Sequence, residues 1–284
     1  MSTHPPEIQL AEIQRDLAFA IEAARAAGER SLAVRATGRW SEDALADVAD
    51  QGADGFLQGI VRGRYPDDGI LSEETADTRS RLSKSRVWII DPLDGTREYS
   101  QLRDDWAVHV ALTIDGKCAL AAVALPSKGP TLWGVCLPGL ERAGIETSLN
   151  EGAEANGRHA LEPGDSRSAE PPRIAVSRSH TPAWTQRFAG KIGAELVHAG
   201  SVGNKVGLCL LGEADLYVHR KQLKEWDTCA PETVARALGW TVCKLRGEEH
   251  VYNRPNPMND ELVVCRPAWK ERVLQGLVAA GALE

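Results

Sequence analysis

The sequence predicts an α/β protein with two lobes. In the first half, two segments with apolar residues at helical spacing precede several apolar runs of strand length, which is typical of an α+β lobe. In the second half, strand-like and helix-like segments alternate, which is typical of an α/β lobe. With 284 residues, 43% of them apolar and 26% charged, the chain can bury a substantial core.

The composition limits which cellular compartments and which partners are compatible with the chain. The net charge of −7 argues against a broad electrostatic contact with polymeric nucleic acid, although a local basic pocket stays compatible with it. The N-terminal segment lacks the basic start and apolar core of a signal peptide, and no apolar run approaches membrane-spanning length. The six cysteines show no Cys-x-x-Cys spacing, so we expect buried free thiols rather than disulfides or zinc ligands. These features predict a cytoplasmic protein without a membrane partner.

Two amphipathic helices are expected at the start of the chain. The first covers residues 7–30, where apolar residues recur at helical spacing and Gly28 is a plausible stop. The second begins after Ser41, a candidate N-cap, and ends before Pro66. Asp50 lies within the second helix, where a lone aspartate is usually solvated.

Two apolar runs then end in pairs of acidic residues. G-I-L-S leads into Glu73 and Glu74, and V-W-I-I leads into Asp91 and Asp94. Carboxylates held together at a sheet edge repel each other unless a cation lies between them. Hard oxygen ligands favour Mg²⁺, Mn²⁺ or Ca²⁺ over zinc. The pattern therefore indicates a divalent metal site.

Gly95 and Thr96 follow the second acidic pair directly. Their backbone N–H groups and the threonine hydroxyl can hold an anion against a metal, which indicates phosphate chemistry. The alternative is an acidic turn that only closes the strand, since Asp-Pro and Asp-Gly are ordinary turn dipeptides.

The remaining first lobe is expected to be a polar loop at 75–86 followed by strands at 106–114, 117–125 and 131–137. Residues 138–172 are rich in Gly, Glu, Ala and Ser with little periodicity, and an irregular hairpin or a loop is expected there. We therefore predict a first lobe at 1–140, an irregular connection at 141–172 and a second lobe at 173–284.

Strands and helices are expected to alternate in the second lobe. The predicted strands cover 173–176, 195–198, 215–219, 240–245 and 261–265. One predicted helix begins near residue 182, and the other predicted helices cover 202–211, 228–238 and 268–280.

Three motifs occur in an order that resembles a known superfamily. They are S-E-E at 72–74, W-I-I-D-P-L-D-G-T at 88–96 and W-D-T-C-A-P-E at 226–232. The chain resembles the lithium-sensitive, Mg²⁺-dependent phosphatases, which include inositol monophosphatases, fructose-1,6-bisphosphatases and 3′(2′),5′-bisphosphate nucleotidases. The resemblance covers most of the chain and implies a layered αβαβα sandwich.

Further segments resemble the nucleotidase branch, which includes CysQ-type enzymes acting on 3′-phosphoadenosine 5′-phosphate. They are R-E-Y at 97–99, S-R-S-H at 177–180 and G-S-V-G-N-K at 200–205. Inositol monophosphatases usually carry an Asn-Phe pair slightly after the shared D-G-T instead. The segment around Asp50 is only loosely similar, because Ala49 stands where a threonine is common.

The resemblance implies a metal site made of carboxylates. Two or three Mg²⁺ ions would be bound, with Mn²⁺ as a substitute. Asp50 would hold a metal-bound water and Thr96 would orient the nucleophile, and both would be catalytic together with Glu73. A cluster of this kind suits a hydrolysis in which metals activate water and stabilise the leaving alkoxide. The implied metal ligands are Glu73, Asp91, Asp94, Asp227 and the carbonyl oxygen of Leu93.

The resemblance also implies contacts to the substrate. His180 would contact the base or ribose, with a helix cap as the alternative role. Lys205 would bind the 5′-phosphate and Arg220 would add charge, with solvated side chains as the alternative. His109, which alternates with valines, is expected to be an interior histidine. The implied substrate contacts are Gly95, Thr96, His180, Ser201, Lys205 and Arg220.

The leading hypothesis is hydrolysis of the 3′-phosphate of 3′-phosphoadenosine 5′-phosphate, or of its sulfated derivative, by metal-activated water. The expected partner is thus a small phosphorylated nucleotide, and a homodimer is kept as a hypothesis. The alternative within the enzymes is an inositol monophosphatase or a phosphatase of broad specificity for sugar phosphates, including fructose 1,6-bisphosphate.

Two other classes of protein are less compatible with the sequence. An aspartyl-phosphate mechanism fits less well, because the spacing D-x-x-D-G-T is one residue too long and Glu73 and Glu74 would be unexplained. A binding protein without turnover fits less well, because every implied metal-binding side chain is a carboxylate and Thr96 is present.

Overall fold

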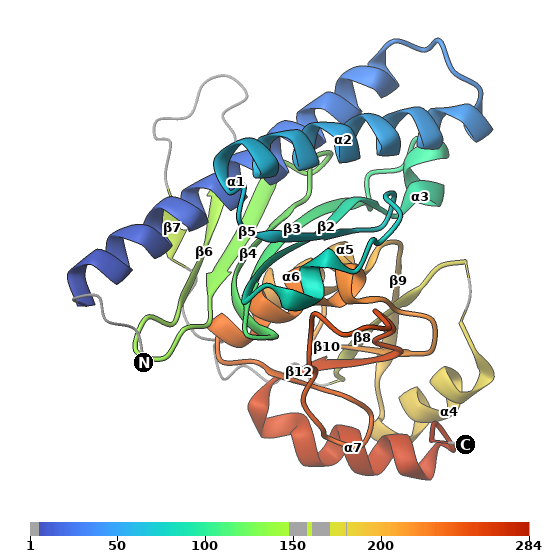
Figure 1. Cartoon of the computed structure of the whole chain (residues 1–284). Coiled ribbons are helices and arrows are strands. Elements are labelled where there is room, and N and C mark those ends of the chain that lie inside the picture. Colours follow the sequence, from blue (N-terminus) through green and yellow to red (C-terminus); the bar gives the residue numbers. More distant parts are fainter. Residues whose placement is uncertain (1–5, 148–157, 161–170, 180, 284) are drawn as a thin grey trace.

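The computed structural model describes residues 6–147, 158–160, 171–179 and 181–283, which build two sheets and the helices that cover them (Figure 1). The first sheet, as far as it is described, has seven strands in sequence order, with β1 parallel to β2 and every later pair antiparallel. Its strands are β1 (Gly69–Ser72), β2 (Arg86–Asp94), β3 (Ala107–Ile114), β4 (Lys117–Ala124), β5 (Pro130–Val135), β6 (Arg142–Thr147) and β7 (Arg158–Ala160).

The second sheet has the strand order β11-β12-β10-β8-β9 in the described chain. β8 runs parallel to β9 and β10, whereas β12 is antiparallel to β10 and β11. Its strands are β8 (Arg173–Ser177), β9 (Glu195–Ala199), β10 (Leu216–Arg220), β11 (Thr241–Cys243) and β12 (Glu261–Cys265).

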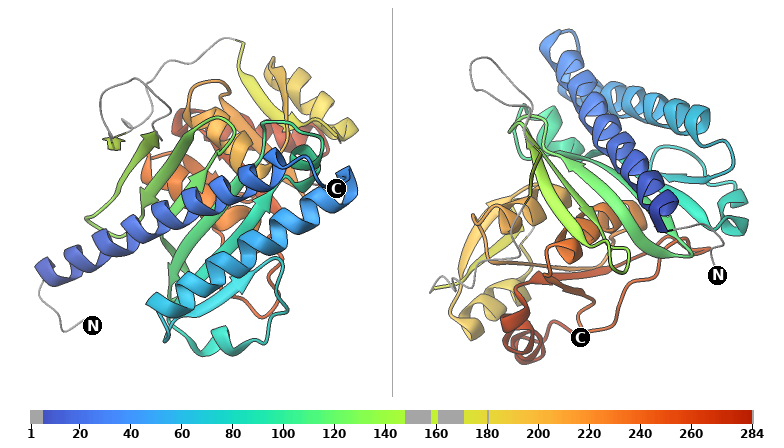
Figure 2. Two further views of the ribbon diagram at one scale, coloured as in Figure 1. Left: turned by 90° about the horizontal axis from the view of Figure 1, so that it is seen from above. Right: turned by 90° about the vertical axis from the view of Figure 1, so that its left-hand side faces the viewer.

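Helices separate and cover the two sheets. Two long helices lie on one face of the first sheet, α5 and α6 lie between the sheets, and α4 and α7 pack together beyond the second sheet (Figures 1 and 2). The arrangement is the layered αβαβα sandwich that the sequence predicts, so the predicted fold class is confirmed. The helices are α1 (Pro6–Ala36), α2 (Glu42–Arg64), α3 (Thr96–Ser100), α4 (Ala183–Ile192), α5 (Val202–Leu210), α6 (Glu225–Ala237) and α7 (Lys270–Ala279).

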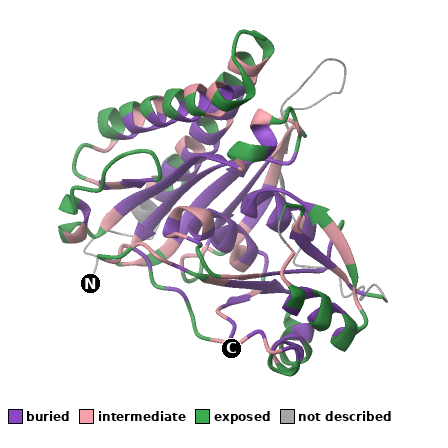
Figure 3. Ribbon diagram, turned by 90° about the vertical axis from the view of Figure 1, so that its right-hand side faces the viewer, coloured by how far each residue is buried: buried purple, intermediate pink, exposed green. Residues whose placement is uncertain are grey.

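The buried apolar residues of the described chain form three clusters: one on each side of the molecule under the outer helices, and one around α5 and α6 that contacts both sheets. The strands of the first sheet are buried on both faces, and the outer faces of α1 and α2 are exposed (Figure 3). Val108 and Val110 of β3 pack towards α1 and α2, while Ala107 and Ala111 pack towards α5 and α6. The third cluster joins the second sheet to α4 and α7. The functional residues described below therefore stand on a rigid double-sided sheet.

Two predicted helix limits were wrong. Gly28 does not end α1, which continues to Ala36. A Cβ at Gly28 would overlap with the ring of Pro126, so this glycine allows close packing instead of a stop. α6 begins at Glu225, three residues earlier than predicted, because Asp227 accepts a hydrogen bond from the Lys224 N–H at 2.6 Å and caps the first turn.

Two segments expected to be irregular contain structure. Residues 75–86 include a 3₁₀ turn at Ser80–Ser83, which Arg81 anchors through a buried guanidinium paired with Asp77. The expected connection contains β6 and β7, which are paired as a hairpin. The lobe boundaries themselves stay a prediction. All six cysteines are unpaired, as predicted. A helix that could span a membrane is absent from the described residues.

Candidate active site

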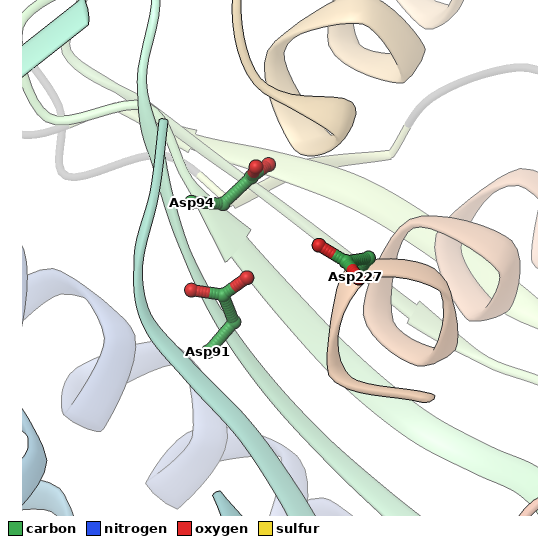
Figure 4. Close-up of side chains that lie close together, drawn as sticks. All are labelled: Asp91, Asp94 and Asp227. Carbon is green, nitrogen blue, oxygen red and sulfur yellow. The ribbon is translucent and has the colours of Figure 1, made fainter. Parts of the chain in front are cut away.

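Three carboxylates from two elements converge between the layers. Asp91 and Asp94 lie at the end of β2, and Asp227 lies in the first turn of α6 (Figure 4). One oxygen atom of each lies within 4.8 Å of the others. The pairing of β2 with β3 shifts register between Asp91 and Asp94, where Pro92 interrupts the strand. The strand end and the helix start thus present acids to a common point.

The charges in this cluster fit a cation. Burial, followed by the charge of Asp94, raises the pKa of Asp91 and raises the pKa of Asp227 to about 7. Two buried oxygens, Oδ2 of Asp91 and Oδ1 of Asp50, have no hydrogen-bond partner among the described residues. Buried carboxylates without partners are costly unless they are protonated or bound to a cation. An all-oxygen donor set of this kind suits Mg²⁺ or Mn²⁺.

Asp94 differs from its neighbours because several donors surround it. Burial acts to raise its pKa, but contact with His109 and hydrogen bonds from Ser201 and Gly203 outweigh that effect and lower the pKa to about 2. The Ser201 hydroxyl and the Gly203 N–H donate to Asp94 Oδ2 at 2.5 and 2.6 Å. Asp94 is therefore held as a carboxylate by the start of α5.

His109 links two parts of the cluster. Its Nε2 atom lies 3.2 Å from Asp94 Oδ2, and its Nδ1 atom lies 3.1 Å from the Trp226 carbonyl oxygen, one residue before Asp227. The side chain is fully buried, so the predicted interior position is correct. Sequence reasoning missed its contact with Asp94. The signal was its place on β3 opposite Asp91, which becomes visible only with the strand register.

Two further acids approach the cluster from other elements. Glu73 follows β1, and desolvation, then the charge of Asp94, raises its pKa to about 7 even though the residue is partly exposed. Asp50 lies in α2, and burial, then the charges of Glu74 and Glu73, raises its pKa to about 8. The structure thus brings Glu73 into electrostatic reach of all three converging aspartates, and Asp50 into electrostatic reach of Asp91.

The turn after β2 completes this side of the site. Leu93 is buried, and its N–H donates to Asp91 Oδ1 at 3.1 Å. Gly95 has a φ of 98° and a Cβ there would lie 3.2 Å from the Cβ of Ser201, so the turn needs a glycine. Thr96 is exposed at the first position of α3, beside the acids.

Lys205 lies inside the protein and not in solvent. It is 4% exposed, and its Nζ atom lies 5.1 Å from the centre of the Tyr217 ring. Burial lowers its pKa, although the charges of Asp94 and Glu98 oppose this effect. The solvated alternative for Lys205 is therefore wrong. Glu98, which sequence reasoning left without a role, supplies one of the charges that face this lysine.

A cavity of about 580 Å³ opens at the ends of β8 and β10 and the start of α4. Tyr217 lines this cavity and also underlies Lys205. Arg220, the last residue of β10, lies at the cavity too, together with Trp184. His180 falls outside the described residues.

Asp105 joins the two segments expected to contact the substrate. Its Oδ2 atom accepts hydrogen bonds from the Arg178 guanidinium at 2.5 Å and from the Gly200 N–H at 2.6 Å. Arg103 binds the other oxygen at 3.1 Å. Asp105 was not singled out from the sequence, because Arg178 and Gly200 lie more than seventy residues away. The loop after α3 thus fixes the segments around Arg178 and Gly200 relative to the acids.

Comparison with known proteins gives matches over nearly the whole chain. Residues 8–282 match the inositol monophosphatase family. The 3′-phosphoadenosine 5′-phosphate phosphatase of Mycobacterium leprae is 36% identical over 277 residues, 94% of each chain, and that of Mycobacterium bovis is 35% identical over 262 residues, 89% of each chain. The crystal structure of CysQ from Bacteroides thetaiotaomicron has a TM-score of 0.77 at 25% identity, covering 89% of this chain and 97% of that one.

Proposed function

The chain belongs to the inositol monophosphatase family, and from this membership we propose that it is a Mg²⁺-dependent phosphomonoesterase that removes the 3′-phosphate of 3′-phosphoadenosine 5′-phosphate to give AMP and phosphate. One observation carries the choice of substrate. Relatives that match 89–94% of the chain at 35–36% identity are phosphatases of this nucleotide. The buried three-aspartate cluster supports the choice of reaction.

The carboxylates are the groups that would bind the metal. Asp91, Asp94 and Asp227 would hold two or three Mg²⁺ ions, or Mn²⁺ in their place, together with Glu73 and the carbonyl oxygen of Leu93. When bound, the metals would polarise the phosphoryl group and make water a better nucleophile at neutral pH. The raised pKa values of Asp91 and Asp227 support this role, because burial and then the charge of Asp94 disfavour their ionised forms, and a bound cation would favour those forms.

Residues beside the acids would position the reactants. The unpaired Oδ1 atom of Asp50 would hold the attacking water and take its proton, with Glu73 as the second acid near that water. Gly95 and the exposed Thr96 would contact the phosphoryl group and orient the water. Ser201, whose hydroxyl donates a hydrogen bond to Asp94, would contact the substrate beside that carboxylate. In-line attack then breaks the bond between phosphorus and the 3′-oxygen, which takes a proton from solvent and leaves as a hydroxyl.

The cavity at the ends of β8 and β10 would receive the nucleoside. Its volume of about 580 Å³ suits a nucleotide-sized ligand. Lys205 would bind the 5′-phosphate, Arg220 would add positive charge, and His180 would contact the base or ribose. The homodimer and the cytoplasmic location stay predictions.

A kinetic panel tests this proposal. Phosphate release is measured from 3′-phosphoadenosine 5′-phosphate, inositol 1-phosphate and fructose 1,6-bisphosphate at fixed Mg²⁺. We expect the nucleotide to give the highest kcat/KM, with activity that requires Mg²⁺, falls with Li⁺ and disappears in Asp94→Asn. A higher kcat/KM for inositol 1-phosphate would overturn the assignment of the substrate but not the proposed mechanism. No release from any of the three would favour a binding role.

A further inference from the structure

Asp54 is a buried acid that the proposed reaction does not use. It lies one helical turn after Asp50 on α2 and is 6% exposed. In the described structure its carboxylate accepts hydrogen bonds from three side chains. The Ser72 hydroxyl donates to Oδ1 at 2.5 Å, the Thr75 hydroxyl donates to Oδ2 at 2.8 Å, and the Gln58 amide donates to Oδ2 at 2.7 Å.

Two of these donors flank the acidic pair that follows β1. Ser72 is the last residue of the strand, Glu73 and Glu74 come next, and Thr75 follows them directly. One carboxylate therefore fastens both ends of the Glu73–Glu74 dipeptide to α2, the helix that also carries Asp50.

The dipeptide needs such a restraint because its surroundings repel it. Glu73 lies in the field of Asp94, and Asp50 lies in the fields of Glu74 and Glu73. Before a metal binds, like charges drive these segments apart. Asp54 adds to the repulsion, since its charge helps to raise the pKa values of Asp50 and Glu74. An acid at this position is thus electrostatically unfavourable, and its use is to accept three hydrogen bonds.

We propose that Asp54 is a positioning residue for the metal site: by binding Ser72 and Thr75 it holds Glu73 in reach of Asp94 before the metal arrives, and so increases the affinity for Mg²⁺. The inference deepens the proposed function and rests on it for the identity of the metal. Residues that orient metal ligands commonly affect metal affinity or activity 10- to 100-fold, to order of magnitude.

The surroundings of Asp54 allow the idea to be tested without unfolding the protein. Arg62 donates to the Gln58 side-chain oxygen, which leaves the Gln58 NH₂ group directed at Asp54. A cavity of about 260 Å³ is lined by Gln58, Ser72 and Thr75. Thr75 is exposed, so water can replace a group removed from it.

The test uses the full chain and two matched pairs of variants. Thr75→Val removes the hydroxyl and keeps the shape, whereas Thr75→Ser keeps the hydroxyl. Asp54→Ala removes every acceptor, whereas Asp54→Asn can accept from Thr75 and Gln58 and donate to the Ser72 oxygen. Mn²⁺ binding without substrate is measured by electron paramagnetic resonance, and the Mg²⁺ concentration for half-maximal phosphate release is measured alongside kcat and the melting temperature.

We expect Asp54→Ala to weaken Mn²⁺ binding and to raise the half-maximal Mg²⁺ concentration by about 10- to 100-fold. Thr75→Val should weaken Mn²⁺ binding and raise the half-maximal Mg²⁺ concentration by roughly 3- to 10-fold, because the Thr75 hydroxyl no longer donates to Asp54 or accepts from Gln58. At saturating Mg²⁺, kcat should stay within about twofold, and Thr75→Ser and Asp54→Asn should resemble the unmodified protein. This split between metal affinity and kcat is not expected from a general loss of stability.

Results that contradict the role of Asp54 can be distinguished from a failure to fold and from a failure of the proposed function. Unchanged Mn²⁺ affinity in a folded Asp54→Ala protein would overturn the inference. An equal loss of Mn²⁺ affinity in Thr75→Val and in Thr75→Ser would overturn it as well. If Asp54→Ala does not fold, the threonine pair decides. If the unmodified chain binds Mn²⁺ but releases no phosphate from the nucleotide, the proposed function fails, while the comparison of Mn²⁺ affinities still decides the role of Asp54.

Discussion

The imidazole of His109 lies between two parts of the acidic cluster, with Nε2 3.2 Å from Asp94 Oδ2 and Nδ1 3.1 Å from the carbonyl oxygen of Trp226. Burial acts to lower the pKa of His109, but Asp94 outweighs it and the pKa is raised. The side chain therefore supports Asp94 from β3 and holds the start of α6, where Asp227 lies.

Replacing His109 by leucine should weaken metal binding. Asp94 would lose its contact with Nε2, and the Trp226 carbonyl would lose its buried donor. We expect the half-maximal Mg²⁺ concentration for phosphate release to rise by about 10- to 100-fold. His109→Gln, whose amide can approach Asp94, is the control and should lose less. Equal Mg²⁺ requirements for the leucine variant and the unmodified protein would contradict this role.

Gly203 provides the space in which His109 and Asp94 meet. A Cβ at residue 203 would overlap with His109 Nε2 and lie 3.0 Å from the Cβ of Ala107. We expect Gly203→Ala to destabilise the protein by about 1–3 kcal/mol and to reduce activity, measured by urea unfolding and phosphate release. Gly207→Ala, in the same helix, meets only the side-chain ends of Leu125 and Leu132 and is the control. Equal losses of stability in both variants would show that the contact with His109 does not matter.

Asp91 and Asp94 were predictable from the local sequence, whereas Asp227 and the role of Asp50 were implied only by the resemblance to the Mg²⁺-dependent phosphatases. Asp91 and Asp94 end an apolar strand, and a strand end is recognisable from a few neighbouring residues. The donors around Asp94 were not predictable in the same way, since Ser201 and His109 reach it only after α5 and β3 have packed against β2. Gly28 was wrongly predicted to end α1 for the same reason, since it packs against Pro126, which lies almost a hundred residues further along the chain.

Asp105 should control substrate binding more than catalysis. Its carboxylate holds Arg178 and the Gly200 N–H, and neither contact reaches the three converging aspartates. We expect Asp105→Ala to raise KM for the nucleotide by about tenfold or more while kcat falls less, because the loss of hydrogen bonds to a charged group frees both segments. Asp104→Ala, at the exposed neighbouring residue, should leave KM within about twofold. A fall in kcat alone would assign Asp105 to the chemical step instead.

Glu232 should make stability depend on pH on the acid side. This buried carboxylate contacts His250 Nδ1 at 2.6 Å, accepts from the Tyr252 hydroxyl at 2.6 Å and binds Arg236 Nε at 2.6 Å. Burial acts to raise its pKa, but these partners outweigh burial and lower the pKa below its ordinary value of 4.5. Because the folded pKa is lowered, the stabilisation is complete above the unfolded pKa and is lost as the pH falls through the folded one.

Urea unfolding of Glu232→Gln at pH 7 and at about pH 3.5 checks this dependence. The variant should be less stable than the unmodified protein by about 3 kcal/mol at pH 7, because Arg236 loses its buried carboxylate partner. The difference should shrink at the acid pH, where protonation removes the same charge from Glu232. Glu249→Gln changes an exposed acid 3.7 Å from the same Arg236 and should cost less than about 1 kcal/mol at both pH values. A difference for Glu232→Gln that is equal at both pH values would mean that shape and packing, and not the charge of Glu232, stabilise this part of α6.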